Sequence, residues 1–391
     1  MNKILDFLYR NKIGKDQESM VLIPARGENL LEGYINLKGK FIIEPQFIFA
    51  HKFDGGNAVV RAANGKYGII DKRGDYIIEP RFDFLSDFFD EDMAKFQIND
   101  EIGFVNKQDE IVIKPRLIKY WDDIGCFHEG LAYVRNDINM FGYINKSDEL
   151  VIKSNFFVAK DFCEGLACVI RYGEKYGYID KTGNWIIKPQ FNKADNFSEG
   201  LAAVGLGVGP CDYGWYYMHE YGFIDKNGQF VIKPQFDWAS PFLQGFSRVE
   251  IKRKWGVINK DGDFVIEPKY DGIESTSEGL FCVKVENKYG AINKDGDIVI
   301  EPQFDNMSNF KSGLATVRIN NKHGIIDKDG NYVVSPQNDS IVDIYPGLAY
   351  VVAVEGNTKK IYFKTTKETI GNFWQHKFIN MEGETFYIEP W

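Results

Sequence analysis

The sequence lacks a long apolar run, because no uncharged hydrophobic stretch approaches the roughly 20 residues that a membrane-spanning helix needs. It also lacks positive charge: 47 Lys and Arg oppose 56 Asp and Glu, for a formal net charge of −9. Affinity for nucleic acid comes mainly from Lys and Arg that neutralise phosphates. We therefore expect neither a membrane span nor a nucleic-acid partner.

Cysteine and histidine are scarce, with five of each in the chain. The sequence has no C-x-x-C or H-E-x-x-H metal motif, no P-loop, and no nucleophile-elbow or protein-kinase signature. The run Gly205-x-Gly207-x-Gly209 resembles a phosphate loop, but Pro210 and a β segment follow where phosphate binding would require a helix N-terminus. The sequence therefore predicts a protein that is not an enzyme and has no metal or cofactor.

The cysteines are odd in number and unsuited to a disulfide framework or a zinc site. We expect free, buried thiols in a reducing cytoplasm, at Cys126, Cys163, Cys168, Cys211 and Cys282. A cytoplasmic location is also what the first ten residues predict, since Asp6 and Arg10 interrupt a short apolar stretch and no small-residue cleavage site follows.

Glycine and aromatic residues, in contrast, are abundant: the chain has 38 glycines and is 15% aromatic, which excludes a disordered chain. The segment Lys66–Asp83 returns, with small changes, as Lys175–Asn192 and as Lys254–Asp271. One glycine anchors each copy, and the copies follow at steps of 34 to 45 residues. This register predicts nine units of about 34 residues, anchored at Gly33, Gly68, Gly103, Gly142, Gly177, Gly222, Gly256, Gly290 and Gly324.

Each unit is predicted to be a β-meander. Two short runs of β-branched and aromatic residues flank an Asp-Lys-x-Gly turn, whose glycine favours a positive φ. Asp109 and Asp148 replace that glycine in two units, and Asp is one of the few residues that tolerate the same conformation. A proline such as Pro80 is expected to end the second run, since it has no amide to donate. A segment such as Glu199–Val204 then opens a third strand, with a short fourth stretch per unit.

The anchoring glycine is expected to let a neighbouring ring or backbone lie flat on its strand. The residue before it is usually aromatic, as in Tyr67, Phe141, Tyr176 and Trp255. We expect these rings to pack in the core between units; a row of rings that stack on a ligand is the alternative.

The whole unit resembles the WG-containing repeat family of bacterial proteins, and the similarity covers about residues 31–352. Only Trp255 supplies the Trp of the family name, so the resemblance rests on the complete unit. It implies a β-repeat architecture with a binding or scaffolding role, and it brings no catalytic residues.

The predicted fold is all-β, an open superhelical or solenoid-like array, with a closed or near-closed β-propeller as the alternative. We assign residues 1–30 to an N-terminal cap, in which residues 3–11 form a short helix. Residues 31–352 form the nine repeats, and residues 353–391 a degenerate C-terminal repeat or cap.

Equivalent positions of stacked repeats form columns on the surface. The residue before the recurrent proline is Lys in four consecutive units and Glu in the units on either side. A cationic block in an acidic protein can steer an acidic partner segment; a solvated surface without function is the alternative. The block consists of Lys114, Lys153, Lys188 and Lys233.

A second candidate is the insertion at residues 205–220, which lengthens one repeat. Loops on rigid scaffolds often carry function, and Tyr and Trp are common interface anchors. We interpret it as an interaction loop; an elongated hairpin that folds on its own unit is the alternative. Its aromatic residues are Tyr213, Trp215, Tyr216 and Tyr217.

Two acidic features are interpreted as structural. The turns that begin at Asn259, Asn293 and Asp327 resemble the start of a calcium loop but lack its distant bidentate Glu, so they are predicted to be hairpin turns. The recurrent Glu before a turn glycine is given the same interpretation, at Glu129, Glu164, Glu199 and Glu278.

Together these features favour a cytoplasmic binding or scaffold protein that presents a β-repeat surface to a protein partner. A carbohydrate- or cell-envelope-binding module is the alternative, and an enzyme with a site assembled across repeats is a third.

Overall fold

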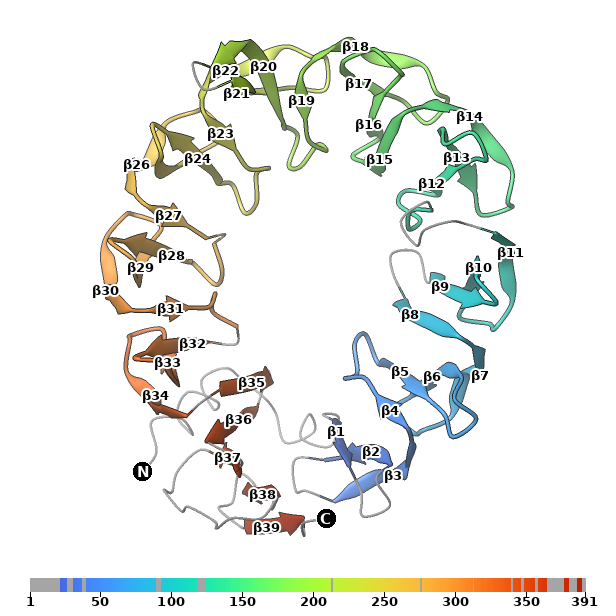
Figure 1. Ribbon diagram of the computed structural model, residues 1–391, viewed down its shortest axis with the longest axis vertical. Coiled ribbons are helices and arrows are strands. Elements are labelled where there is room, and N and C mark those ends of the chain that lie inside the picture. Colours follow the sequence, from blue (N-terminus) through green and yellow to red (C-terminus); the bar gives the residue numbers. More distant parts are fainter. Residues whose placement is uncertain are drawn as a thin grey trace. The chain divides into compact units, whose positions relative to one another are not determined.

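The computed structural model describes residues 22–26, 31–36, 40–88, 93–117, 124–211, 214–274, 276–311, 313–338, 340–345, 348–355, 358–363, 376–379 and 385–388. Within these ranges the regular structure consists of strands β1 to β39, without a helix (Figure 1). The helix predicted at residues 3–11 lies outside the described residues. No helix of the described part is long and apolar enough to cross a membrane.

The nine anchoring glycines lie on nine separate antiparallel sheets, one per repeat. The first five sheets comprise β1 (Ile23–Arg26), β2 (Glu32–Ile35) and β3 (Phe41–Phe47); β4 (Phe49–Ala50), β5 (Asn57–Arg61), β6 (Tyr67–Asp71) and β7 (Tyr76–Phe82); β8 (Phe84–Phe88), β9 (Met93–Ile98), β10 (Glu101–Asn106) and β11 (Ile111–Leu117); β12 (Leu131–Arg135), β13 (Phe141–Asn145) and β14 (Leu150–Phe156); and β15 (Val158–Cys163), β16 (Leu166–Ile170), β17 (Tyr176–Ile179) and β18 (Trp185–Phe191).

The next four repeat sheets comprise β19 (Lys193–Ala194), β20 (Ala202–Cys211), β21 (Gly214–Ile224) and β22 (Phe230–Phe236); β23 (Trp238–Ala239), β24 (Ser247–Ile251), β25 (Lys254–Ile258) and β26 (Phe264–Tyr270); β27 (Gly272–Ile273), β28 (Leu280–Val285), β29 (Lys288–Asn293) and β30 (Ile298–Phe304); and β31 (Asn306–Met307), β32 (Leu314–Ile319), β33 (Lys322–Asp327) and β34 (Tyr332–Asn338). A three-stranded sheet of β35 (Ser340–Tyr345), β36 (Leu348–Glu355) and β37 (Thr358–Phe363) follows, and then the pair β38 (His376–Ile379) and β39 (Thr385–Ile388).

Strand order within each sheet follows the chain, so each repeat is a meander of three strands plus, in most repeats, a short first strand, as predicted. No sheet of the described residues closes on itself, which is consistent with the predicted open array. The chain forms two compact units. The first comprises Met1–Phe82, Thr276–Asn293 and Asp297–Trp391, and the second comprises Asp83–Ser275 and Lys294–Gly296.

The Asp-Lys-x-Gly turns are hairpin turns, as predicted. In the β6–β7 turn, Asp71 Oδ1 accepts hydrogen bonds from the amides of Arg73 and Asp75, and Gly74 has a φ of 92°. Asp109 and Asp148 adopt φ values of 62° and 63° in the equivalent turns. The calcium-like turns are built in the same way: the side-chain oxygens of Asn259 and Asp327 each accept two backbone amides, while that of Asn293 accepts the amide of Asp297.

The recurrent proline does not end its strand, contrary to our expectation. Pro189 lies inside the seven-residue β18, at a register shift where Tyr176 pairs with Phe191 but Tyr178 pairs with Ile187. The missing amide is tolerated because the bulge leaves residues unpaired and β18 is an edge strand. The anchoring glycine faces this bulge: a Cβ on Gly177 would lie 2.7 Å from the Ile187 carbonyl oxygen. A ring carbon of Trp185 would lie equally close, at 2.7 Å, so that both backbone and a ring lie against this glycine, as expected.

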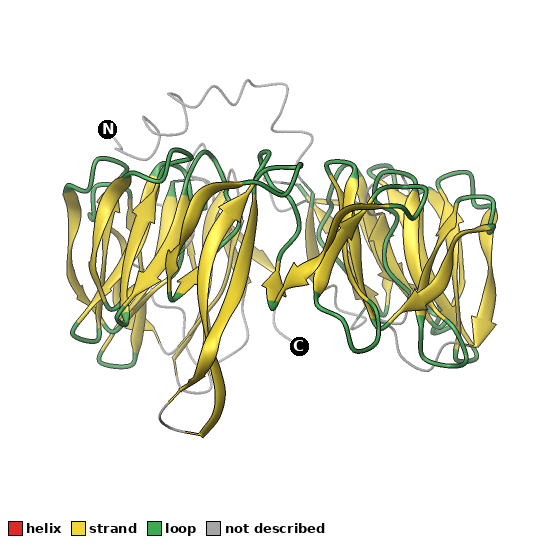
Figure 2. Ribbon diagram, turned by 90° about the horizontal axis from the view of Figure 1, so that it is seen from above, coloured by secondary structure: helices red, strands yellow, loops and turns green. Residues whose placement is uncertain are grey.

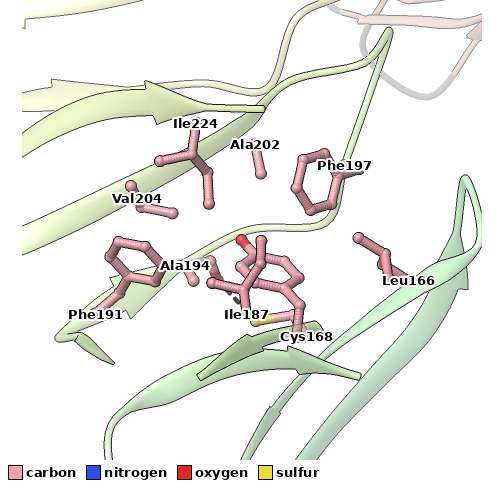
Figure 3. Packing of buried hydrophobic residues seen from close by; sticks show 10 residues of the cluster. Leu166, Cys168, Ile187, Phe191, Ala194, Phe197, Ala202, Val204 and Ile224 are labelled. Carbon is pink, nitrogen blue, oxygen red and sulfur yellow. Dashed lines mark hydrogen bonds between the residues drawn. The ribbon is translucent and has the colours of Figure 1, made fainter. Parts of the chain in front are cut away.

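The hydrophobic core lies between successive sheets. Figure 3 shows the core between the β15–β18 and β19–β22 sheets, built around Phe191, Phe197 and Ile224. Tyr176, which precedes an anchoring glycine, is half-buried and packs against this core. The same holds for Phe141, Tyr221 and Tyr289 at other sheets, so core packing of these rings is confirmed.

The recurrent Glu residues join one repeat to the next. Glu164 accepts the Gly200 amide at 3.0–3.1 Å and lies 3.1 Å from Lys226 Nζ, both in the following repeat. We call this arrangement the glutamate clasp; Glu129, Glu199 and Glu278 form the same contacts with the repeats that follow them. The structural interpretation of these residues is confirmed.

Candidate binding surface

The last strand of each repeat, which we call the closing strand, presents one face to solvent. In β18 the residues alternate, so that Ile187 and Phe191 are buried while Ile186, Lys188 and Gln190 are exposed. Within the second unit, the closing strands β14, β18, β22 and β26 lie along one side of the succession of sheets (Figure 1). Their exposed positions therefore lie on the same side of this succession of sheets.

The four predicted lysines occupy the fourth position of four consecutive closing strands, β11, β14, β18 and β22, all in the second unit. Each is exposed, and in the described part of the chain none has an ion-pair partner within 4 Å. The next closing strand, β26, carries Glu267 at this position. We call Lys114, Lys153, Lys188 and Lys233 the lysine column.

Apolar side chains accompany the lysine column, a feature that we did not predict. Val151, Ile186 and Val231 stand two residues before a column lysine and are 43%, 48% and 50% exposed. Because side chains alternate along a strand, each shares the solvent face with its lysine. The two-residue period of the pattern x-Ile-Ile-Lys could have revealed this. The surface thus offers both cations and apolar area to a ligand.

The insertion is an elongated hairpin and not the predicted loop. β20 and β21 pair out to Cys211 and Gly214, well past the point where the equivalent hairpins turn. Figure 2 shows this hairpin extending beyond the ends of the neighbouring strands. The reason is local, because Val, Tyr and Trp have a high propensity for strands. Trp215, Tyr216 and Tyr217 lie on β21, and Tyr213 lies outside the described residues.

Lys160, Cys168 and Asp195 lie close together but do not form a nucleophilic site. Lys160 Nζ donates to the Ala194 carbonyl and to Asp195 Oδ1, each at 2.9 Å. Burial raises the pKa of the nearby Cys168 thiol to about 12, so this thiol is protonated at neutral pH and a weak nucleophile. Cys126, Cys163, Cys168 and Cys282 are free thiols, as predicted, the first two only half-buried. The described residues include no group of three or more His, Cys, Asp or Glu that could hold a metal.

Eight segments of the chain match one family model, described as the WG containing repeat: residues 33–67, 67–101, 102–137, 141–174, 176–207, 221–255, 255–289 and 289–322. The chain belongs to this family. The ninth anchoring glycine, Gly324, lies beyond the last matched WG repeat but on a sheet of the same strand order, β31–β34. The sequence register and the sheets therefore extend the WG repeats by one unit.

Solved structures are similar to this chain at low identity. A eukaryotic initiation factor is 11% identical, with a TM-score of 0.51 over 81% of this chain and 96% of its own. The dihydro-heme d1 dehydrogenase NirN in complex with DHE is 12% identical, with a TM-score of 0.39 over 82% of this chain and 78% of its own. The computationally designed Ika8 protein is 10% identical, with a TM-score of 0.38 over 73% and 95%. A comparison with curated proteins found no match.

Proposed function

We propose that this WG repeat protein is a non-enzymatic binding protein of the cytoplasm, whose lysine column binds an acidic segment of a protein partner. The observation that carries the proposal is four exposed lysines at one repeat position, without ion pairs within the described residues and beside exposed apolar side chains. Unpaired cations raise the association rate of an acidic ligand, and the adjoining apolar area adds burial on contact.

The test is binding of a fluorescein-labelled ten-residue peptide that alternates Glu with Val, measured by fluorescence anisotropy at low salt. The quadruple variant K114E/K153E/K188E/K233E should bind at least tenfold more weakly, because attraction becomes repulsion. Its melting temperature should stay nearly unchanged, because exposed charges contribute little to stability.

The matched control is K40E/K175E/K193E/K311E, which changes four exposed lysines outside the column and shifts the net charge equally. If this control weakens binding as much as the column variant does, only the net charge matters and the column is not a site. A peptide that alternates Gln with Val should not bind.

The elongated hairpin is a second candidate contact, because it extends beyond its neighbours in a fold whose other repeats do without it. If Trp215 anchors a partner, Trp215→Ala should weaken partner binding by about 2 kcal/mol or more with little loss of stability. Trp255→Ala is the control. The ring centroids of Trp255 and Trp238 lie 5.1 Å apart, so removing the Trp255 ring should lower the melting temperature. Equal melting of the two variants would contradict an interface role.

A further inference from the structure

Four of the hairpins between the second and third strands of a repeat turn through two residues that both have positive φ. Turns of this type strongly favour Asn, Asp and Gly, because a longer side chain crowds the left-handed conformation. Three of the four contain Asn or Asp: Asn99–Asp100, Glu286–Asn287 and Asn320–Asn321. The fourth contains Lys252 and Arg253, with φ values of 50° and 63°.

Two long cations in this conformation are a cost to the fold that a different sequence would avoid. The β32–β33 turn offers a matched comparison within the same molecule, because Asn320 and Asn321 adopt the same conformation there, with φ values of 51° and 60°. Residues in sparsely populated φ/ψ regions are found more often at functional sites than elsewhere. A residue that destabilises the fold can be kept in the sequence there because it contributes to binding. The Lys252–Arg253 turn is therefore a candidate site.

The charges of this turn are available to a ligand. Lys252 and Arg253 are exposed, and neither side chain has a hydrogen bond or an ion pair within the described residues. The next residue differs: Lys254 Nζ lies 2.6 Å from Asp271 Oδ1 and is thereby neutralised. Neither cation has an ion pair within 4 Å, while two carboxylates lie nearby: Glu250 interacts electrostatically with Arg253, and Asp237 Oδ2 accepts the Lys252 amide at 2.5 Å.

A rigid aromatic base supports this tip. The ring centroids of Trp255 and Trp238 are 5.1 Å apart, and the Arg248 guanidinium lies 5.9–6.0 Å from both rings. Arg248 is held in turn, because its Nη1 donates to the Ile273 carbonyl at 2.9 Å. A ligand at the tip therefore meets a hairpin that is already ordered, and little conformational entropy is lost on binding.

We propose that the Lys252–Arg253 turn is a docking point for an acidic peptide segment, separate from the lysine column. The two sites share no residue, so either can fail without the other. A short acidic peptide fits better than a membrane or a nucleic acid, because the net charge of −9 repels an extended anionic surface. A peptide senses only the charges within about a Debye length of the tip.

The test pairs binding with stability, using the double variant K252N/R253N and the labelled Glu-Val peptide at about 0.1 M salt. Every protein compared also carries K114Q/K153Q/K188Q/K233Q, so that the lysine column does not bind the peptide and mask the turn. The variant should bind the peptide about threefold to tenfold more weakly, with a shallower dependence on salt. It should also melt a few degrees higher, because Asn relieves the strain of both residues. Weaker peptide binding together with a higher melting temperature would show that Lys252 and Arg253 contribute to binding at the expense of stability.

Two controls separate charge from strain. K252Q/R253Q removes the charges but keeps the strain, so it should weaken binding equally without the rise in melting temperature. N320K/N321K installs the strained pair at the β32–β33 turn, so it should melt lower and leave peptide affinity nearly unchanged.

The proposal is overturned if K252N/R253N binds the peptide with unaltered affinity. It is also overturned if N320K/N321K raises affinity as much as K252N/R253N lowers it, because any cationic turn would then suffice. Vesicles containing phosphatidylserine and a ten-nucleotide single-stranded DNA are included as other anions. Stronger loss of binding to either of these than to the peptide would reject the acidic-peptide assignment. Because the column variant is measured beside these proteins, failure at the turn is distinguishable from failure at the column.

Discussion

At two junctions between successive repeats, different residues fill the same part of the hydrophobic core. Between the β15–β18 and β19–β22 sheets, a fully buried Tyr178 fills the core beside Ala194. Between the β27–β30 and β31–β34 sheets, the equivalent positions are Ala291 and Met307. The large side chain has moved from the third strand of one repeat to the first strand of the next. The large side chain of the junction can therefore come from either of the two repeats that meet there.

The features that both junctions share define the repeat. Cys168 Sγ and Cys282 Sγ each lie 3.7 Å from a carbonyl oxygen of the next first strand, those of Ala194 and Met307. Both junctions also contain a glutamate clasp. The two junctions also differ in one hydrogen bond. The Tyr178 hydroxyl donates to the Asp195 carbonyl at 2.7 Å, whereas Ala291, at the equivalent position, has no hydroxyl group to donate.

The largest expected effect comes from emptying the first junction. Tyr178→Ala removes a fully buried ring and should lower the free energy of unfolding by about 3–5 kcal/mol. Chemical denaturation followed by tryptophan fluorescence measures it.

The comparison of the two junctions predicts a second substitution that restores part of the stability lost in Tyr178→Ala. Adding Ala194→Met to Tyr178→Ala recreates the arrangement of the second junction, and it should recover part of the lost stability. Ala194→Met alone should destabilise the protein by about 1–3 kcal/mol, because the core is already full. A double variant no more stable than Tyr178→Ala alone would show that the two positions do not compensate each other.

Local chemistry made most of the fold predictable from the sequence. The nine glycines, the Asp-Lys-x-Gly turns and the two-residue alternation act within one repeat, so the strands and the exposure of Lys188 followed from neighbours in the chain. The place of Pro189 did not follow, because its bulge arises from pairing between β17 and β18. Nor did the partners of Glu164, which lie 36 and 62 residues away in the chain, at Gly200 and Lys226.

The candidate sites were predictable only in part. The lysine column is a pattern of identities at one register position, which a sequence displays directly. The apolar side chains beside it, such as Val231, could have been predicted from the two-residue alternation, which puts them on the same face as a column lysine. The Lys252–Arg253 turn was missed because its unusual feature is a pair of φ values, and the sequence Lys-Arg-Lys alone indicates only a charged turn.

The smallest expected effect concerns the glutamate clasp. Burial alone would raise the pKa of Glu199, but hydrogen bonds from Lys260 and from the Gly245 amide lower that pKa below its ordinary value. A carboxylate with a lowered pKa stabilises the fold above the unfolded-state pKa of about 4.3, and this stability is lost as the pH falls through the folded-state pKa.

Glu199→Gln should therefore reduce the free energy of unfolding by about 0.5–1 kcal/mol at pH 7, since the clasp is partly exposed. Gln can still accept the Gly245 amide, so the variant isolates the charge. The difference from the unaltered protein should shrink as the pH falls from the unfolded-state pKa of about 4.3 through the lowered folded-state pKa, because the carboxyl group is then protonated in a growing fraction of the molecules. Glu174→Gln removes an equal charge from an exposed residue outside any clasp, and it should change stability little at either pH. Denaturation curves at pH 7 and pH 3.5 decide the matter: a pH-independent difference for Glu199→Gln would mean that the clasp stabilises through its shape and not its charge.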